Sequence, residues 1–217
     1  MARNKHPEET VKKILDVSMK LFLEKGYDHT TLSDIIQVSG LSKGAIYHHF
    51  ASKAEILIRI CDRIGEENAA QLEAVKEDRS LNGRQKLKAA FRASLLADNQ
   101  RTMMNIVPTL TDNPQFLALE MSAIYEEAVP DYIEPIIREG ISDGSICSEH
   151  PRETAEILVV LSDLWLNPVA RAATPEEVRA RCRVYNQITE GLGLGDMLDE
   201  DVIEALAEYA QQKREGI

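Results

Sequence analysis

The sequence "SGLSKGAIYHHF", from Ser39 to Phe50, contains two signals that divide it into the end of one helix and the start of another. Gly40 suits the left-handed turn that often ends a helix. Ser42 is a favourable N-cap. We therefore expect one helix to end at Gly40 and a second, short helix to cover about 43–49, with a tight turn between them.

This second helix has an inward and an outward side. At 100° per residue, Ile46 and Phe50 point the same way, which places both in a core. The other side chains lie opposite or on the flanks, with the first of them at the helix start: Lys43, Gly44, Ala45, Tyr47, His48 and His49. Two short helices with an exposed second helix are typical of the helix-turn-helix, whose second helix enters the major groove of DNA.

The outward residues have chemistry that suits DNA. Lys43 can donate to guanine O6 and N7, Ala45 can contact a thymine methyl group, and Gly44 lets the backbone approach base edges. Hydroxyl, imidazole and ammonium groups, and the capped start of the helix, can bind phosphates. The predicted DNA-binding residues are Thr31, Ser33, Ser42, Lys43, Gly44, Ala45, Tyr47, His48, His49 and Lys53.

Residues 30–53 have one other interpretation, a turn-rich joint between core helices. The helix caps and the inward positions of Ile46 and Phe50 agree with either interpretation. The outward cluster of one Lys, one Tyr and two His residues does not suit a joint between core helices. We therefore expect this region to bind DNA.

The rest of the chain also reads as helix. An apolar stripe at three- and four-residue steps predicts a helix over about 8–25. Thr31 and Asp34 resemble a capping box and predict another helix over about 32–38. No run of alternating Val, Ile and Thr residues indicates a sheet. The predicted fold class is all-α, with a three-helix helix-turn-helix head followed by a larger helical bundle.

Charge separates the two parts of the chain. Residues 1–54 carry eight Lys or Arg and six Asp or Glu, a net charge of +2. Residues 55–217 carry seventeen and thirty, a net charge of −13, which completes the total of −11. A mildly basic head and a strongly acidic body indicate separate roles. We predict a helix-turn-helix DNA-binding domain at 1–54 and a second helical domain at 55–217.

Residues 8–57 resemble the N-terminal domain of the TetR family of bacterial transcriptional regulators. The resemblance rests on Thr30-Thr31, Asp34-Ile35-Ile36, the stretch from Ser39 to Phe50, and Ser52-Lys53. It implies that the body at 55–217 dimerises and holds an effector pocket. Effector binding in this family alters the spacing or mobility of the two heads and releases DNA.

The same resemblance places the dimer contact on helices at 151–170 and 175–191. The first of these is apolar nearly all round, so core burial within one subunit explains it equally well. Pro168 should kink or stop this helix.

Met and aromatic side chains of the body could line an effector pocket, although such residues at helical spacing more often belong to the hydrophobic core. Asn99, Asn105 and Asp163 become relevant if they lie buried beside this set. The candidate ligand-binding residues are Phe91, Met103, Met104, Phe116, Met121, Tyr125 and Trp165.

No motif of the sequence indicates an enzyme, a cofactor or a metal. Glu-x-x-His motifs and phosphate-binding G-x-x-x-x-G-K loops do not occur. His48 and His49 point 100° apart and cannot easily share one ion.

Three widely spaced cysteines are typical of buried thiols in a reducing cytoplasm. The longest apolar run, at 157–161, is far shorter than the roughly 20 residues that span a membrane.

The sequence therefore predicts a cytoplasmic, homodimeric DNA-binding regulator. Its partners would be a double-stranded, pseudo-palindromic DNA operator and a small-molecule effector that releases it, which makes it a ligand-responsive repressor. The alternatives are an all-α enzyme and an interaction module whose helix-turn-helix binds protein.

Overall fold

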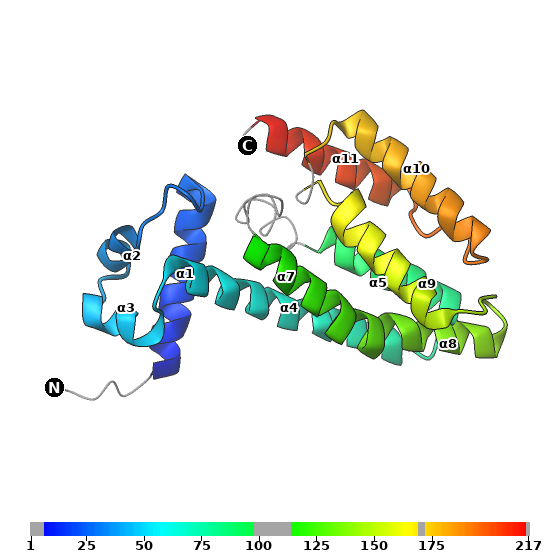
Figure 1. Ribbon diagram of the computed structural model, residues 1–217, viewed down its shortest axis with the longest axis horizontal. Helices are drawn as coiled ribbons and strands as arrows, with labels where there is room; N and C mark the ends of the chain where they lie inside the picture. Colours follow the sequence, from blue (N-terminus) through cyan, green and yellow to red (C-terminus); the bar gives the residue numbers. More distant parts are fainter. Residues whose placement is uncertain (1–6, 98–113, 169–171, 216–217) are drawn as a thin grey trace. The chain divides into compact units, whose positions relative to one another are not determined.

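The computed structural model describes residues 7–97, 114–168 and 172–215, and every element in these ranges is a helix (Figure 1). The all-α prediction is therefore confirmed. The helices are α1 (Pro7–Lys25), α2 (Leu32–Ser39), α3 (Lys43–His49), α4 (Lys53–Glu77), α5 (Gly83–Leu96), α7 (Pro114–Ser122), α8 (Glu134–Asp143), α9 (Pro151–Val160), α10 (Pro175–Gly191) and α11 (Glu200–Glu215). Two π-helical segments, η2 (Ala123–Ile133) and η3 (Leu161–Leu166), directly continue α7 and α9.

The chain divides into two compact units within α4, between Glu66 and Glu67. We call the first unit the head and the second the body. Helix α4 begins in the head and ends in the body, so the chain passes between the units without a break in the helix. The functional boundary at 54/55 stays a prediction.

The head is held together by apolar side chains from all four of its helices. The inward stripe of α1 is buried as the periodicity predicts, and the inward residues of α2, α3 and α4 meet it. The fully buried members of this core are Ile14, Phe22, Ile35, Ile46, Ile56, Leu57 and Ile60. Because α3 contributes only one fully buried side chain, most of its surface is left for another purpose.

One buried polar atom of the head has no partner. Ser18 on α1 is fully buried, and its Oγ makes no hydrogen bond. Burying an unpaired hydroxyl costs free energy, and Ala is also the better helix former. We expect Ser18→Ala to raise the free energy of unfolding by up to about 1 kcal/mol, measured by urea denaturation.

Ser39 provides the matched control for this prediction. It is also buried, but its Oγ donates to the Ile36 carbonyl and accepts from the Leu41 N–H, both at 3.3 Å. Ser39→Ala should therefore lower the free energy of unfolding. Destabilisation of equal size in both variants would contradict the assignment of Ser18 as an unpaired group.

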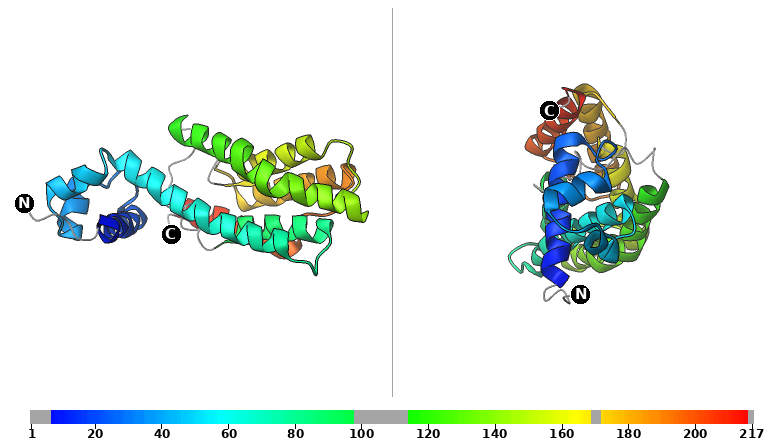
Figure 2. Two further views of the ribbon diagram at one scale, coloured as in Figure 1. Left: turned by 90° about the horizontal axis from the view of Figure 1, so that it is seen from below. Right: turned by 90° about the vertical axis from the view of Figure 1, so that its left-hand side faces the viewer.

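The body is built around a continuous helical rod of α7, η2 and α8, which packs against α9 (Figure 2). Helices α10 and α11 lie side by side and α11 also contacts α5 (Figure 1). A single apolar cluster joins these elements, with Leu87, Ile136 and Tyr185 among its fully buried members. None of the described helices is both long and apolar enough to cross a lipid bilayer.

Backbone contact between α5 and α8 is unusually close. A Cβ atom added to Gly83 would collide with the backbone of Gly140. The Asp143 carboxylate accepts from the Gly83 N–H at 2.7 Å, and Ser145 Oγ accepts from the Arg84 N–H at 3.1 Å. The first turn of α5 is thus fixed to the last turn of α8 and the loop that follows it.

The helical segment at 151–170 ends earlier than the sequence predicts. Helix α9 and η3 run without interruption to Leu166, and Asn167 is already extended. Pro168 stops the helix, as expected, because a proline disfavours helical backbone at the residue before it. Residues 169–170 of the predicted range lie outside the described residues.

Candidate DNA-binding site

The turn between α2 and α3 has the geometry that its sequence predicts. Thr31 caps α2 in a full capping box with Asp34, and Gly40 adopts a left-handed conformation with φ of 66°. Ser42 caps α3, where its Oγ accepts from the Ala45 N–H at 3.2 Å. These local bonds fix both ends of the turn, so the start of α3 is held in one orientation within the head.

The two sides of α3 divide as the helical wheel predicts. Ile46 is fully buried and Phe50, directly after the helix, is 3% exposed. Tyr47 is 47% exposed, and Ala45 and His49 are partly exposed. The remaining outward residues, Ser42, Lys43, Gly44 and His48, are exposed. Nothing lies within 4 Å of the position that a Gly44 Cβ would take, so this part of the helix is open to a partner.

The cations and aromatic rings of α3 lie close to one another. Lys43 Nζ is 5.5 Å from the centre of the Tyr47 ring, and the His48 and His49 rings meet edge to face at 5.0 Å. These side chains can donate hydrogen bonds to phosphates on the two flanks of the helix. No group of three or more His, Cys, Asp or Glu side chains in the described parts of the chain is arranged to hold a metal ion.

Thr31 is already engaged within the head. Its Oγ1 donates to Asp34 Oδ2 at 2.6 Å and accepts from the Asp34 N–H at 3.1 Å. The bond from the Thr31 hydroxyl is the main reason that the pKa of Asp34 falls to about 2, and the Thr31 N–H and Lys25 add to the effect. To bind a phosphate, the Thr31 hydroxyl would have to give up Asp34. Ser33, also on the predicted list, is exposed.

Lys53 also makes contacts that the sequence did not indicate. Its Nζ donates to the Tyr27 carbonyl at 2.6 Å, approaches the Asp28 carbonyl at 3.5 Å, and lies 4.1 Å from the centre of the Tyr27 ring. Tyr27 in turn packs edge to face against Phe22 in the head core. Lys53 therefore links the start of α4 to the turn after α1, and an ammonium group has three donors, so it can still reach a phosphate.

A shallow hollow with a volume of about 410 Å³ lies beside the end of α3 and was not predicted. Its floor is apolar, and Arg63 on its edge forms an ion pair with Asp16 at 2.8 Å. The lining residues are Pro7, Glu8, Val11, Lys12, Leu15, His49, Arg59 and Arg63. Only tertiary contact between α1, α3 and α4 brings them together, so no local sequence signal could have found it.

The candidate ligand-binding residues of the body lie in different environments. Phe91 is buried in the core and packs edge to face on Tyr185, with ring centres 6.2 Å apart. Met121 and Trp165 are partly buried against the same core, whereas Tyr125 is 43% exposed. Met103 and Met104 lie outside the described residues, and the Phe116 side chain is likewise not described. Their shared pocket stays a prediction.

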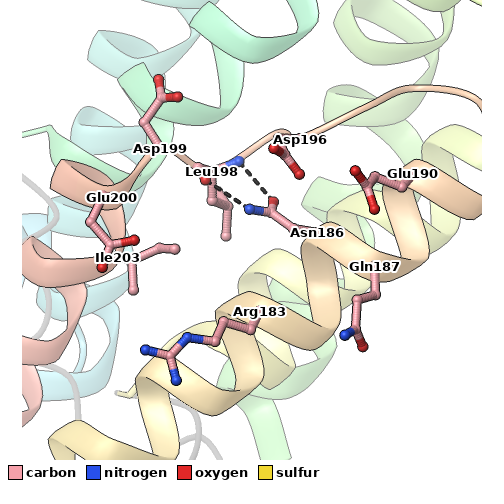
Figure 3. Close-up of a pocket in the computed structure, with 9 residues that line it drawn as sticks. All are labelled: Arg183, Asn186, Gln187, Glu190, Asp196, Leu198, Asp199, Glu200 and Ile203. Carbon is pink, nitrogen blue, oxygen red and sulfur yellow. Dashed lines mark hydrogen bonds between the residues drawn. The ribbon is translucent and has the colours of Figure 1, made fainter.

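A polar hollow with a volume of about 360 Å³ lies between α10 and the start of α11 (Figure 3). Asn186 forms its floor: its Nδ2 donates to the Leu198 carbonyl at 2.8 Å, and its Oδ1 accepts from the N–H groups of Met197 and Leu198. The Glu190 and Asp196 side chains face each other across it (Figure 3). None of the predicted ligand-binding residues lines this hollow.

A capped helix-turn-helix with an exposed second helix, joined to a helical body, defines the class of helix-turn-helix regulators. Residues 14–60 match the model of the bacterial regulatory proteins of the tetR family. This match covers most of the head, and the curated proteins that are similar to this part of the chain are transcriptional regulators.

Two curated relatives are similar to the first part of the chain. AcrR of Shigella flexneri, an HTH-type transcriptional regulator, is 39% identical over 75 residues, which are 34% of each chain. IcaR of Staphylococcus aureus strain Newman, a negative transcriptional regulator of the biofilm operon icaADBC, is 50% identical over 44 residues, 20% of this chain and 24% of its own. The matches thus span about a third or less of these relatives.

Solved structures extend the similarity to the whole fold. SmeT, the repressor of the Stenotrophomonas maltophilia multidrug efflux pump SmeDEF, aligns with a TM-score of 0.61. The alignment covers 91% of this chain and 95% of SmeT at 23% sequence identity. At this identity the similarity shows a shared fold, with the helix-turn-helix head followed by a helical domain.

Proposed function

We propose that the protein is a transcriptional repressor that binds a pseudo-palindromic DNA operator as a homodimer and is released by a small-molecule effector. The observation that carries the proposal is the exposed face of α3, which presents Lys43, Gly44 and His48. The buried side chain of Ile46 anchors the opposite face of this helix in the head core. A protein that reads DNA in this way would work in the cytoplasm. The curated relative IcaR, a negative regulator, supports repression as the outcome.

The four residues from Ser42 to Ala45 have different roles in DNA binding. Lys43 donates to guanine O6 and N7, Ala45 contacts a thymine methyl group, and Gly44 allows their close approach. Ser42 and the N-terminus of α3 bind a phosphate. The remaining residues, Thr31, Ser33, Tyr47, His48, His49 and Lys53, bind phosphates that fix the register of the head on the duplex.

Exposed apolar side chains on two body helices support a dimer. Ile157 on α9 is 43% exposed and Val184 on α10 is 42% exposed, and Ala180 lies one turn before Val184 on the same open face. Contiguous exposed apolar surface marks protein contacts, and these side chains lie on the two helices that the family resemblance assigns to the dimer. A twofold dimer would place two α3 helices about one turn of DNA apart, or a multiple of that distance.

The effector part of the proposal draws on SmeT, whose structure has also been solved as a complex with triclosan. The similar fold favours an effector site in the body of this chain as well. Among the described candidates, Met121 and Trp165 combine partial burial with contact to the core, which suits residues that line a pocket.

Two lysine variants test the division between base and phosphate contacts. Lys43→Ala should cost roughly 1–3 kcal/mol of binding free energy on the operator and relax the preference at one base pair. Lys53→Ala should weaken binding to all sequences alike and lower the salt slope by about one. Both are measured by fluorescence anisotropy on operator and random duplexes. Equal loss on both duplexes for Lys43→Ala would contradict its assigned role.

The experiment that tests the function as a whole is a selection of bound duplexes from a random pool with the purified, full-length protein. We expect an enriched pseudo-palindrome with two matched half-sites, which would support DNA reading and the dimer together. Screening small molecules for loss of this binding then tests the effector. If ligand-stripped, refolded protein enriches no site, the proposed function is wrong.

A further inference from the structure

The turn between α1 and α2, residues 26–31, is fixed by hydrogen bonds within the head. Gly26 is left-handed with φ of 81°, and its N–H donates to the Phe22 carbonyl at 3.0 Å. Thr30 is 1% exposed, its Oγ1 donates to the Gly26 carbonyl at 2.8 Å, and its N–H donates to the Tyr27 carbonyl at 3.2 Å. The backbone of Tyr27 is therefore held in one place.

The ring of Tyr27 lies between the head core and Lys53. It meets the ring of Phe22, which is fully buried, edge to face with ring centres 5.2 Å apart. Lys53 Nζ lies over the same Tyr27 ring, 4.1 Å from its centre. An ammonium group over an aromatic ring is attracted by the quadrupole of the ring. The Phe22 ring thus limits the orientations of Tyr27, and the Tyr27 ring limits those of Lys53.

The known contacts of the Lys53 ammonium come from two adjacent residues of this turn. Its Nζ donates to the Tyr27 carbonyl at 2.6 Å and approaches the Asp28 carbonyl at 3.5 Å. The Tyr27 carbonyl has two lone pairs, and it accepts from both Lys53 and the Thr30 N–H. An ammonium has three donors, so these two carbonyls leave one N–H of a partly exposed lysine for a further acceptor.

Fixing a lysine before it binds has an energetic consequence. A lysine side chain has many rotamers, and it loses this freedom when its ammonium is held against a phosphate. For Lys53 the ring and the carbonyl of Tyr27 restrict the side chain already in the free protein. Less entropy is then lost on binding, and the phosphate contact is stronger than that of an unrestrained lysine.

We propose that Tyr27 is a positioning residue for DNA binding, whose ring and carbonyl hold the Lys53 ammonium so that its remaining N–H meets a phosphate of the duplex. The inference rests on the proposed function, in which Lys53 binds a phosphate. Tyr27 acts through Lys53 and does not contact DNA itself. It thereby differs from the residues assigned to the DNA-binding site above, each of which contacts DNA or lets the backbone approach it.

Two variants of Tyr27 separate its ring from its hydroxyl. Tyr27→Leu keeps apolar bulk against Phe22 and the backbone carbonyl, but removes the ring face. It should weaken binding to operator and random duplexes alike, by about three- to tenfold, because phosphates carry no sequence information. The salt slope should also fall, by at most the amount that Lys53→Ala removes.

Tyr27→Phe keeps the ring face and should bind both duplexes with affinities within about twofold of the native values. A loss as large as that of Tyr27→Leu would show that the Tyr27 hydroxyl itself contacts DNA. That result would overturn the positioning role.

A double-mutant cycle with Lys53 distinguishes positioning from plain packing. If Tyr27 acts through Lys53, then Tyr27→Leu should change DNA affinity less than about twofold once Lys53→Ala is present. If Tyr27 only stabilises the head, the two losses should add, since each would act independently of the other. Additive losses would therefore overturn the proposal.

A measurement without DNA checks the contact itself. Because Lys53 Nζ lies over the Tyr27 ring, the ring current should shift the ε-protons of Lys53 upfield in the NMR spectrum of the full-length, 13C-lysine-labelled protein. Lys53→Arg assigns the signal. The shift should persist in Tyr27→Phe and disappear in Tyr27→Leu. A native protein without this shift would overturn the proposal whatever its affinity for DNA.

Tyr132 in the body provides the matched control. Its ring lies 5.2 Å from Lys76 Nζ and packs partly buried against the body core, so Tyr132→Leu removes a similar ring beside a similar ammonium. Tyr132→Leu should keep native DNA affinity and salt slope, and a loss equal to that of Tyr27→Leu would overturn the specific role of Tyr27. Absence of DNA binding by the native protein would overturn the proposed function together with this role, whereas native binding with additive losses would overturn the role of Tyr27 alone.

Discussion

Replacing Gly44 with Glu is expected to abolish specific DNA binding while the head stays folded. Gly44 is the second residue of α3, it has a helical backbone, and nothing lies within 4 Å of the position of an added Cβ. A Glu side chain there fits the protein and gains about 0.5–1 kcal/mol of helix propensity. Its negative charge also interacts favourably with the positive end of the helix dipole. The same carboxylate would meet the bases and phosphates of the operator.

The expected loss is at least about 100-fold in affinity, or about 3 kcal/mol, because a like charge in an interface costs several kcal/mol. Anisotropy on the selected operator measures the affinity, and thermal unfolding measures the fold. The expected signature is unchanged or higher stability together with lost binding, which separates a DNA-facing position from a structural one.

Gly65 on α4 offers the matched control within the head. It is exposed and helical, its added Cβ would also meet nothing within 4 Å, and Gly65→Glu makes the same change in charge. Gly65→Glu should keep operator affinity within a few-fold of the native value. If both variants lost binding equally, net charge and not the face of α3 would be responsible, and the assignment of α3 as the reading helix would be wrong.

Replacing Gly83 with Ala is expected to destabilise the body more than Gly140→Ala or Gly191→Ala. The added Cβ would collide with the backbone of Gly140, and backbone atoms cannot rotate away as a side chain can. Separating the helices would also strain the Asp143 bond to Gly83 and the Lys86 to Glu139 ion pair, whose N to O distances are 2.7 and 2.8 Å. We expect a loss of about 2–3 kcal/mol.

Thermal unfolding should show this loss as a decrease of about 5–10 °C in melting temperature. Gly140→Ala should cost less, because its Cβ would meet the side chain of Ile146, 2.5 Å from Cδ1, and not backbone. Gly191→Ala, at the end of α10 with nothing within 4 Å, serves as the neutral control. A small effect at Gly83, similar to that at Gly191, would show that α5 and α8 can separate freely.

Much of the head could be predicted because its signals are local. The caps at Thr31 and Ser42, the left-handed Gly40 and the inward Ile46 each act within four residues of the chain. Helical periodicity carries the same information for α1, which begins one residue before its predicted start. The face that α3 leaves open follows from the same 100° step and needs no knowledge of its neighbours.

The roles of Thr31 and Lys53 show where local reasoning ends. Their types suit phosphate contacts, but the Thr31 hydroxyl is bonded to Asp34, and Lys53 reaches back 26 residues to the Tyr27 carbonyl. Nothing in the sequence around Lys53 indicates that the turn after α1 lies beside it. The hollow lined by Lys12, His49 and Arg59 was missed for the same reason.

By itself, then, the sequence determined the all-α class, the helix-turn-helix and its outward face, because hydrogen bonds and side-chain directions within a few residues define them. Only the tertiary structure decided that Gly83 must be glycine and that Lys53 reaches the Tyr27 carbonyl. These features depend on which helices meet and at which residue. Such contacts join positions 26 to 57 residues apart, and packing of the whole core selects them.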